Sequence, residues 1–365
     1  MPTSTLPNYL HLDEMKEMSN DCRTYLPPEW APQSGVMLTW PHAHGDWARN
    51  LPVVEPVFVE LAATIARFER VLIVCRNTDH QQHVAGLLAE HSPDPDRLRY
   101  VVAPSNDVWA RDHGALTVIC SGEPQLLDFR FNGWGSKYSH DLDNAITPTI
   151  YRAGVFGDTP METVNLILEG GAVEVDGSGT LLATRSSVLS ATRNGDLSPK
   201  EIEQQLSHYL GIERFLWLEH GTLSGDDTDG HIDTLARFCD RDTIAYCHSD
   251  KADDIDHAEL VAMREELAAF RSITGDPYLL VPLLMPETKL DKDGKRLPAT
   301  YANFLILNDA VLVPLYQDTA DEPALASLRV CFPGREVIGI NALPLILQYG
   351  SLHCVTMQFP EGVII

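Results

Sequence analysis

The sequence predicts an α/β fold built from repeated β-β-α-β units. Strand-like runs rich in branched and aromatic residues recur along the whole chain, and helical patterns lie between them. The pairs Asp176-Gly177 and Asn308-Asp309 are typical of tight turns, and each separates two neighbouring strand-like runs, which indicates hairpins. Segments dense in polar residues return at intervals of roughly fifty to seventy residues, the spacing expected of a repeated structural unit.

The predicted strands are short runs of branched and aromatic residues bounded by polar ones. In chain order, the clearest lie at residues 36–40, 71–75, 115–119, 181–184, 243–247, 304–307 and 311–315.

The best-defined helix begins at Ser198, a residue type that favours the N-cap position. Pro199 suits the first helical position, and Glu201 completes a capping box with the serine. Gly211 ends the helix, because glycine tolerates the left-handed conformation that a helix C-terminus often needs. The apolar stripe of this helix consists of Ile202, Leu206, Tyr209 and Leu210.

A second helix is predicted to begin near Asp254. Its apolar stripe has helical spacing and consists of Leu260, Met263, Leu267 and Phe270. We expect further helices at residues 56–68, 80–91 and 320–329.

The composition argues against several classes of protein. Acidic residues outnumber basic ones by 52 to 27, so nucleic acid and anionic membranes are not expected partners. The formal net charge of −25 serves solubility, and it also suits a cationic small substrate.

Targeting signals are not evident in the sequence. No basic segment followed by an apolar run opens the chain, so we expect no signal peptide. The longest apolar stretches, such as residues 278–285, are too short to span a bilayer. The seven cysteines include no C-x-x-C pair, which favours a reduced, cytoplasmic protein and gives no support to a zinc ribbon.

Two polar segments stand out near predicted strands. Residues 106–114 place Trp109, Arg111 and Asp112 just before an apolar run, which also fits a strand entry with surface charges. In residues 166–172, Glu169 follows apolar residues at a predicted strand end, and Gly170-Gly171 would allow a ligand or another segment to approach the backbone. A simple β-bulge explains the second pattern equally well.

The third segment, residues 224–233, is the most acidic. It is not a calcium loop: with Gly230 as the invariant glycine, the twelfth position would be Ala236, which cannot coordinate the ion. It includes Asp227 and ends in His231-x-Asp233, which alternation would place on one side of a strand, facing one pocket. A histidine beside a carboxylate is a plausible unit for proton transfer.

The fourth segment contains Cys354, which follows a Gly-Ser turn and His353 and precedes a strand-like run. A lone cysteine is often a small buried apolar residue. A cysteine combined with a separate histidine and carboxylates is, however, the pattern of a nucleophile rather than of a zinc site.

These residues have a common chemical logic. A guanidinium is planar and permanently cationic, and carboxylates bind it through charge-assisted hydrogen bonds. Two such carboxylates would hold its central carbon for attack by a thiolate. Because a free thiol has a pKa of about 8.5, a bound cation or a protonated His231 would be needed to favour the thiolate. His231 could then protonate the departing ammonia and activate water.

Together the four segments resemble the agmatine deiminase family, which is related to bacterial peptidylarginine deiminase. The resemblance runs from Trp40-Pro41-His42 to residues 354–358. Its signatures are Trp109-x-Arg111-Asp112, Leu168-Glu169-Gly170-Gly171, Asp227-x-x-Gly230-His231-x-Asp233 and His353-Cys354.

The resemblance implies a five-fold pseudosymmetric α/β propeller of β-β-α-β units, with the active site in a central channel and one domain spanning residues 1–365. It implies hydrolysis of agmatine to N-carbamoylputrescine and ammonia, a step of putrescine biosynthesis, through an amidino-thioether on Cys354 and without a metal or organic cofactor. Homodimers are common among such proteins.

The resemblance also assigns roles to individual residues. Cys354 is the nucleophile and His231 the proton-transfer group, while Asp112 and Asp233 bind the guanidinium. Glu169, Asp227 and Trp109 form the pocket wall and orient the substrate.

Two departures from the family pattern bear on the substrate. Residues 349–352 read Tyr-Gly-Ser-Leu where Gly-Gly-Gly-Asn is usual, and Asp229 stands where asparagine is typical. Arginine and peptidyl-arginine are therefore alternative substrates, and Arg185 or Arg193 could bind the carboxylate of free arginine. An amidinotransferase and a non-catalytic binding protein are the alternatives of other classes.

Overall fold

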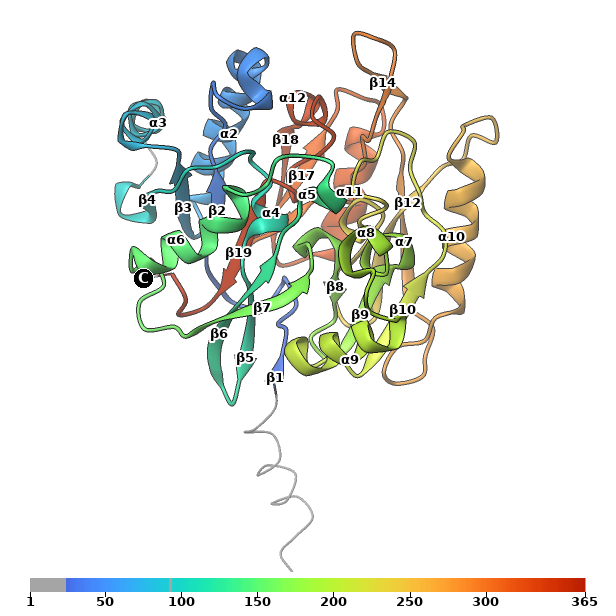
Figure 1. Ribbon diagram of the computed structural model, residues 1–365. Helices are drawn as coiled ribbons and strands as arrows, with labels where there is room; N and C mark the ends of the chain where they lie inside the picture. The colour runs from blue at the N-terminus through green and yellow to red at the C-terminus, as the bar shows by residue number, and fades with distance from the viewer. Residues whose placement is uncertain (1–23, 92–93, 365) are drawn as a thin grey trace, which may run out of the picture.

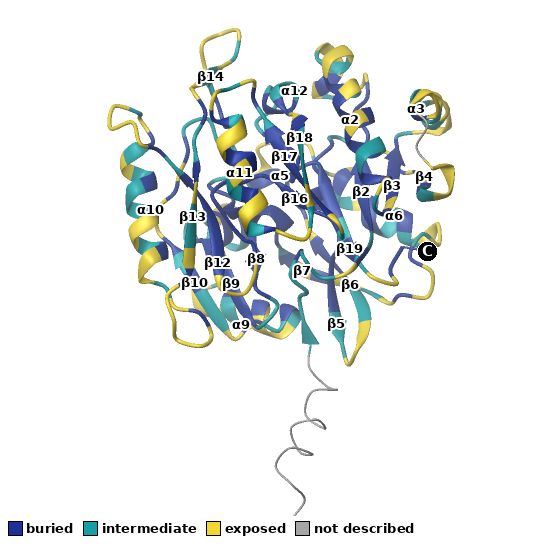
Figure 2. Ribbon diagram, turned by 180° about the vertical axis from the view of Figure 1, so that it is seen from behind, coloured by how far each residue is buried: buried dark blue, intermediate teal, exposed yellow. Residues whose placement is uncertain are grey.

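A computed structural model describes residues 24–91 and 94–364 (Figure 1). Within this part of the chain, strands form the interior and the longer helices lie at the periphery, with their outward faces exposed (Figure 2). The α/β class predicted from the sequence is confirmed. The predicted absence of a signal peptide concerns residues 1–23, which lie outside the described residues.

Five open sheets share one pairing pattern. Each contains two antiparallel strands, and the second of these pairs in parallel with a strand that follows a helical connection. The pattern is the β-β-α-β unit expected from the sequence.

The first sheet joins the two ends of the described chain. Its order is β19-β2-β3-β4, with β2 at Gln33–Thr39, β3 at Arg70–Cys75, β4 at Leu98–Val102 and β19 at Thr356–Pro360. In Figure 1 the red strand β19 lies beside the blue strand β2. The C-terminal strand therefore completes the unit that the N-terminal part begins, and it places residues 351–355 in the middle of the molecule.

The other four sheets follow in chain order. The second has the order β1-β5-β6-β7, with strands Thr24–Tyr25, Leu116–Cys120, Glu123–Arg130 and Met161–Ile167. The third comprises β8 (Glu174–Val175), β9 (Thr180–Thr184) and β10 (Arg214–Leu218). The fourth comprises β11 (Ala236–Phe238), β12 (Thr243–His248) and β13 (Leu279–Leu284). The fifth comprises β16 (Leu305–Ile306), β17 (Ala310–Leu315) and β18 (Glu336–Asn341), and a separate hairpin pairs β14 (Lys289–Leu290) with β15 (Arg296–Leu297).

The longer helices connect the parallel strands. They are α2 (Leu51–Ile65), α3 (Thr78–Glu90), α6 (Ile146–Arg152), α9 (Pro199–Leu210), α10 (His257–Ala269) and α11 (Asp321–Cys331). Helix α9 confirms its predicted boundaries, because Ser198 and Glu201 form the capping box and Gly211 is left-handed with φ 68°. Helix α2 begins five residues before the predicted start at Pro56, because Pro52 occupies the first turn and Pro56 lies inside the helix. Helix α10 begins at His257, three residues after the predicted start near Asp254.

Candidate active site

A cavity lies where several connecting loops converge. Its wall combines the predicted site residues Trp109, Asp112, Asp227 and Cys354 with residues from other loops. These other residues are Asp46, Asp107, Trp134, Tyr138, Thr228, Thr234, Gln348, Tyr349 and Gly350. Loops carry the site because each one begins or ends at a fixed strand, which positions its side chains.

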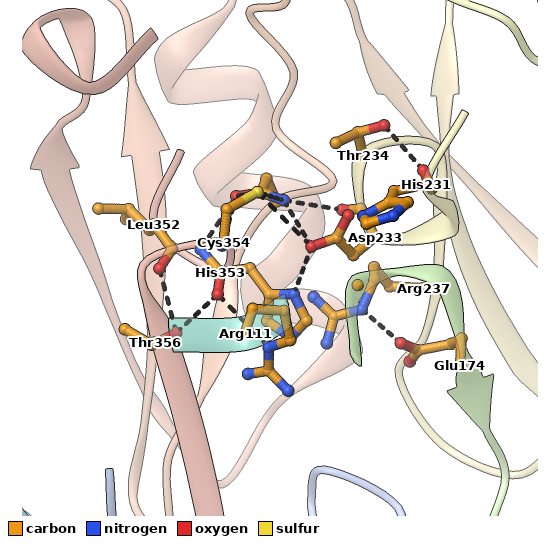
Figure 3. A network of polar contacts seen from close by, with 12 residues as sticks. Arg111, Glu174, His231, Asp233, Thr234, Arg237, Leu352, His353, Cys354 and Thr356 are labelled. Atoms are coloured by element: carbon orange, nitrogen blue, oxygen red, sulfur yellow. Dashed lines mark hydrogen bonds and ion pairs between the residues drawn. The ribbon is translucent and has the colours of Figure 1, made fainter. Parts of the chain in front are cut away.

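Cys354 lies on the cavity wall two residues before β19 and is 5% exposed. Its Sγ atom is 3.3 Å from Asn303 Nδ2 and 3.7 Å from Asp233 Oδ2 (Figure 3). Burial raises the pKa of the Cys354 thiol well above its ordinary value, and the carboxylates of Asp233 and Asp112 raise it further.

Asp112 lies in the short helix α4 (Ala110–His113) and is 4% exposed. Its Oδ2 accepts a hydrogen bond from Trp134 Nε1 at 3.0 Å, and its Oδ1 accepts one from the Gly171 amide at 3.0 Å. Burial and the nearby carboxylate of Asp233 raise the pKa of Asp112 to about 6, although His231 opposes this shift.

Asp233 is fully buried, and only one of its carboxylate oxygens has partners. Oδ2 accepts hydrogen bonds from His353 Nδ1 at 2.8 Å and from Asn303 Nδ2 at 3.1 Å. Oδ1 has no hydrogen-bond partner among the described residues. Burial alone would raise the pKa of Asp233, but the hydrogen bond and charge of His353 lower it below its ordinary value.

His231 lies next to both carboxylates, but not on the strand that we predicted. Residues Ile232–Thr234 form a 3-10 turn, because the amide and hydroxyl of Thr234 both donate to the His231 carbonyl. His231 Nδ1 is 3.7 Å from Asp112 Oδ1. Neither ring nitrogen has a hydrogen-bond partner among the described residues, so both remain available for proton transfer.

Gly171 explains the paired glycines of the second segment. A Cβ atom at this position would lie 2.7 Å from His231 Nδ1, 2.9 Å from Asp112 Oδ1 and 3.1 Å from Asp233 Oδ2. No side chain fits there without displacing the three groups. The predicted close approach of another segment to the paired glycines is confirmed, because a Cβ at Gly170 would lie 2.3 Å from the Arg111 carbonyl oxygen. Residues Gly170–Ala172 form a 3-10 turn and not the β-bulge considered above.

The three predicted pocket residues take different positions. The ring of Trp109 packs against Gly350, where an added Cβ would come within 2.1 Å of it. Asp227 lies on the cavity wall and accepts a hydrogen bond from the Tyr138 hydroxyl. Glu169 is buried away from the cavity wall, where it pairs with Arg193 Nε at 3.0 Å.

Neither arginine considered for a substrate carboxylate lines the cavity. Arg193 pairs with Glu169 and Asp229, and Arg185 pairs with Glu219 at 2.7 Å.

Sequence reasoning missed several residues of the site. Asn303 donates to both Asp233 and Cys354, and its Oδ1 accepts a hydrogen bond from the Cys354 amide at 3.3 Å. Its position just before a predicted strand was the only signal. Trp134, which donates to Asp112, lies in a Gly-Trp-Gly segment with no helical or strand period.

No helix in the described part of the chain is long and apolar enough to cross a membrane. No group of three or more His, Cys, Asp or Glu side chains within residues 24–91 and 94–364 is arranged to hold a metal ion. The expectation that the reaction needs neither metal nor organic cofactor stays a prediction.

Comparison with known proteins identifies relatives along nearly the whole chain. The model of the Porphyromonas-type peptidyl-arginine deiminase family matches residues 25–360. An agmatine deiminase of Stutzerimonas stutzeri (strain A1501) is 32% identical over 362 residues, covering 92% of this chain and 95% of the relative.

Two solved structures share the fold. A Porphyromonas gingivalis protein provisionally named arginine deiminase is 48% identical with a TM-score of 0.89, covering 94% of this chain and 100% of its own. The agmatine deiminase of C. jejuni, a cysteine-to-serine variant with substrate bound, is 33% identical with a TM-score of 0.86, covering 93% of this chain and 97% of its own.

The raised pKa of Asp112 predicts a pH effect on stability. The folded protein binds this proton more tightly than the unfolded chain, so the contribution of Asp112 to stability falls as the pH rises from 3.8 through about 6. Asp112→Asn removes this titration. Between about pH 5 and about pH 7.5, the free energy of unfolding of the variant should therefore improve relative to the parent by about 1 kcal/mol.

Urea unfolding of both proteins at each pH measures this difference. Parallel stability profiles of the parent and the variant would show that Asp112 titrates at its ordinary pKa.

Proposed function

The chain belongs to the Porphyromonas-type peptidyl-arginine deiminase family, to which agmatine deiminases belong, and we propose that it hydrolyses agmatine to N-carbamoylputrescine and ammonia. The observation that carries the proposal is the position of the Cys354 thiol beside two buried carboxylates, Asp112 and Asp233, at the wall of an acidic cavity. Relatives named agmatine deiminase support a hydrolase that acts on carbon–nitrogen bonds.

Binding begins with the two carboxylates. Asp233 Oδ1 is buried without a partner among the described residues, so it can accept N–H groups of a guanidinium. Asp112 offers the remaining lone pairs of its two oxygens, which already accept from Trp134 and Gly171. Together the carboxylates hold the planar cation with its central carbon within reach of Cys354.

The bound cation also activates the nucleophile. Asp233 and Asp112 raise the pKa of the Cys354 thiol. A guanidinium between them neutralises this effect and favours the thiolate, and the thiol proton passes to His231. The Sγ atom then forms a bond to the central carbon, and the bond from this carbon to one terminal nitrogen breaks.

His231 moves the protons in both halves of the reaction. It protonates the departing nitrogen, which leaves as ammonia, while the rest of the substrate stays on Cys354 as an amidino-thioether. His231 then takes a proton from water, whose oxygen attacks the same carbon. The carbon–sulfur bond breaks, and the ureido product and the cysteine are released.

The wall of the cavity supports agmatine as the substrate. Asp46, Asp107 and Asp227 line it beyond the catalytic groups, and none of the described lining residues is Lys or Arg. The free amine of agmatine suits this acidic wall, whereas the carboxylate of free arginine would lie against it.

Arginine remains the second candidate, because the P. gingivalis protein provisionally named arginine deiminase is 48% identical to this chain.

Tyr349 marks the departure from the family pattern beside Cys354. Its backbone is left-handed with φ 69°, a conformation that favours glycine and strains other residues. Its side chain lines the cavity, and Lys295 Nζ lies 4.0 Å from the ring centroid. We infer that Tyr349 restricts which substrate tails fit the mouth of the cavity.

Further expectations remain part of the proposal. The repeated strand pattern supports a five-fold propeller around a central channel, in one domain spanning residues 1–365. We further propose a cytoplasmic enzyme of putrescine biosynthesis that acts as a homodimer. Release of ammonia from agmatine without an added amine acceptor would distinguish hydrolysis from amidinotransfer and from simple binding.

Cys354→Ala should abolish ammonia release from agmatine, because it removes the sulfur that forms the covalent intermediate. Cys120→Ala is the matched control, since Cys120 lies in β5 away from the cavity wall and should leave the rate unchanged. A colorimetric ammonia assay on both variants, with circular dichroism to verify folding, measures the effect. Turnover by folded Cys354→Ala at the parental rate would exclude this mechanism.

Tyr349→Gly should widen the range of substrates. Relative kcat/KM values for agmatine, arginine and a short arginine peptide should converge by roughly tenfold, the scale of discrimination by pocket shape. Gln317→Gly is the control: Gln317 is also left-handed, with φ 53°, but lies outside the cavity wall, so the variant relieves strain without changing selectivity. If the parent prefers arginine to agmatine, the proposed substrate is wrong; unaltered ratios in Tyr349→Gly would remove Tyr349 from substrate selection.

A further inference from the structure

We propose that Glu29 is a positioning residue for this reaction: acting through His353, it keeps Asp233 ionised and leaves one Asp233 oxygen free for the guanidinium. The inference rests on the proposed function, because it assigns the groups that prepare one of the two carboxylates. Glu29 lies before β2, 324 residues from His353, and nothing in the sequence patterns marks it as part of the site.

The first link joins Glu29 to His353. Glu29 is 7% exposed, and its Oε2 lies 2.7 Å from His353 Nε2. The same oxygen accepts a hydrogen bond from Arg237 Nη2 at 2.6 Å, while Oε1 accepts one from the Ile306 amide at 2.6 Å. Both carboxylate oxygens are therefore fixed by buried donors.

The second link joins His353 to Asp233. His353 is 2% exposed, and its Nδ1 lies 2.8 Å from Asp233 Oδ2. Each ring nitrogen thus faces a carboxylate oxygen, and an ionised carboxylate can only accept hydrogen bonds. Only the doubly protonated imidazolium can donate to Glu29 and Asp233 at the same time.

The surrounding charges also require a cation at His353. Arg237 pairs with Glu29 and, at 2.7 Å, with Glu174 Oε2. Arg111 donates through Nε to the His353 carbonyl at 3.4 Å, and its Nη2 is 4.0 Å from Glu29 Oε2. Figure 3 shows both arginines beside His353 and Asp233.

With an imidazolium, this buried cluster holds three cations against the three carboxylates of Glu29, Glu174 and Asp233. A neutral His353 would leave one buried negative charge without compensation, which is costly in a low dielectric.

The contact with His353 determines which Asp233 oxygen can bind the substrate. Its Oδ2 is occupied by His353, Asn303 and Cys354, so the carboxylate is fixed and Oδ1 remains the free acceptor. The other groups that act on Asp233 are Asp112, His231, Arg111 and Arg237.

The pKa values of the two carboxylates that bind the guanidinium, Asp233 and Asp112, shift in opposite directions, as this network predicts. Although burial alone would raise both values, the hydrogen bond and charge of His353 lower the pKa of Asp233. Burial raises the pKa of Asp112 to about 6, because His231 opposes this shift by its charge alone, without a hydrogen bond. One carboxylate is therefore kept charged by the protein, and the other becomes fully charged only above about pH 6.

The most direct test observes the protonation of His353. Protein labelled with nitrogen-15 in its histidines gives the ring signals by NMR, and the signal lost in His353→Asn identifies this residue. At about pH 8, His353 should be doubly protonated in the parent protein and neutral in Glu29→Gln. Glu174→Gln is the matched control, because it removes a carboxylate from the same cluster that makes no hydrogen bond to His353. The loss of the imidazolium should therefore be smaller in Glu174→Gln than in Glu29→Gln.

The pH dependence of activity provides a second test of the role of Glu29. In Glu29→Gln, Asp233 should take up a proton at higher pH, so kcat/KM for agmatine should fall at least about tenfold more between pH 8 and pH 6 than in the parent. Glu29→Asp should restore part of this loss, whereas Glu174→Gln should shift the pH dependence less than Glu29→Gln does.

A neutral His353 in the parent protein would overturn the proposal, even if Glu29→Gln failed to fold. An imidazolium and an unchanged pH profile in folded Glu29→Gln would show that Glu29 only stabilises the fold. The NMR result does not depend on turnover. A parent protein that is inactive toward agmatine would contradict the proposed function, whereas the protonation of His353 would still be decided by NMR.

Discussion

The arrangement of this site depends on one electrostatic constraint: two buried carboxylates, Asp112 and Asp233, lie beside a buried thiol, Cys354. Like charges in a low dielectric raise each other's cost of ionisation, so the two carboxylates raise the pKa of the Cys354 thiol. A planar cation relieves the repulsion and provides the electrophile in the same step. The groups that recognise the substrate are thus also those that control the nucleophile.

Contacts from several segments of the fold hold these site residues in place. The antiparallel pairing of β19 with β2 holds Cys354 in the middle of the molecule, and the Arg111 amide donates to the Cys354 carbonyl at 3.2 Å. Gly171 leaves the space in which Asp112, Asp233 and His231 meet. Because each contact joins segments far apart in the sequence, the site depends on the completed fold.

The sequence predicted the parts of the structure that local patterns encode. The capping box at Ser198 and the ending at Gly211 were confirmed because capping is a local interaction. The alternation rule wrongly placed His231 and Asp233 on a strand, since the 3-10 turn depends on hydrogen bonds from Thr234 to the His231 carbonyl. The contact of Glu29 with His353 could not be predicted, because 324 residues separate the two and pairing at that distance has no periodic signal.

Activation of Cys354 by a cation between Asp112 and Asp233 is tested most directly by alkylation with two matched reagents. Chloroacetamide is neutral, whereas chloroacetamidine is similar in shape and carries an amidinium that both carboxylates can bind. Mass spectrometry of the labelled peptide would give the rate at Cys354 as a function of pH. We expect slow labelling by the neutral reagent at neutral pH and fast labelling by the amidinium, with the advantage lost in Asp112→Asn. Equal rates for the two reagents, with the same pH dependence, would contradict the account.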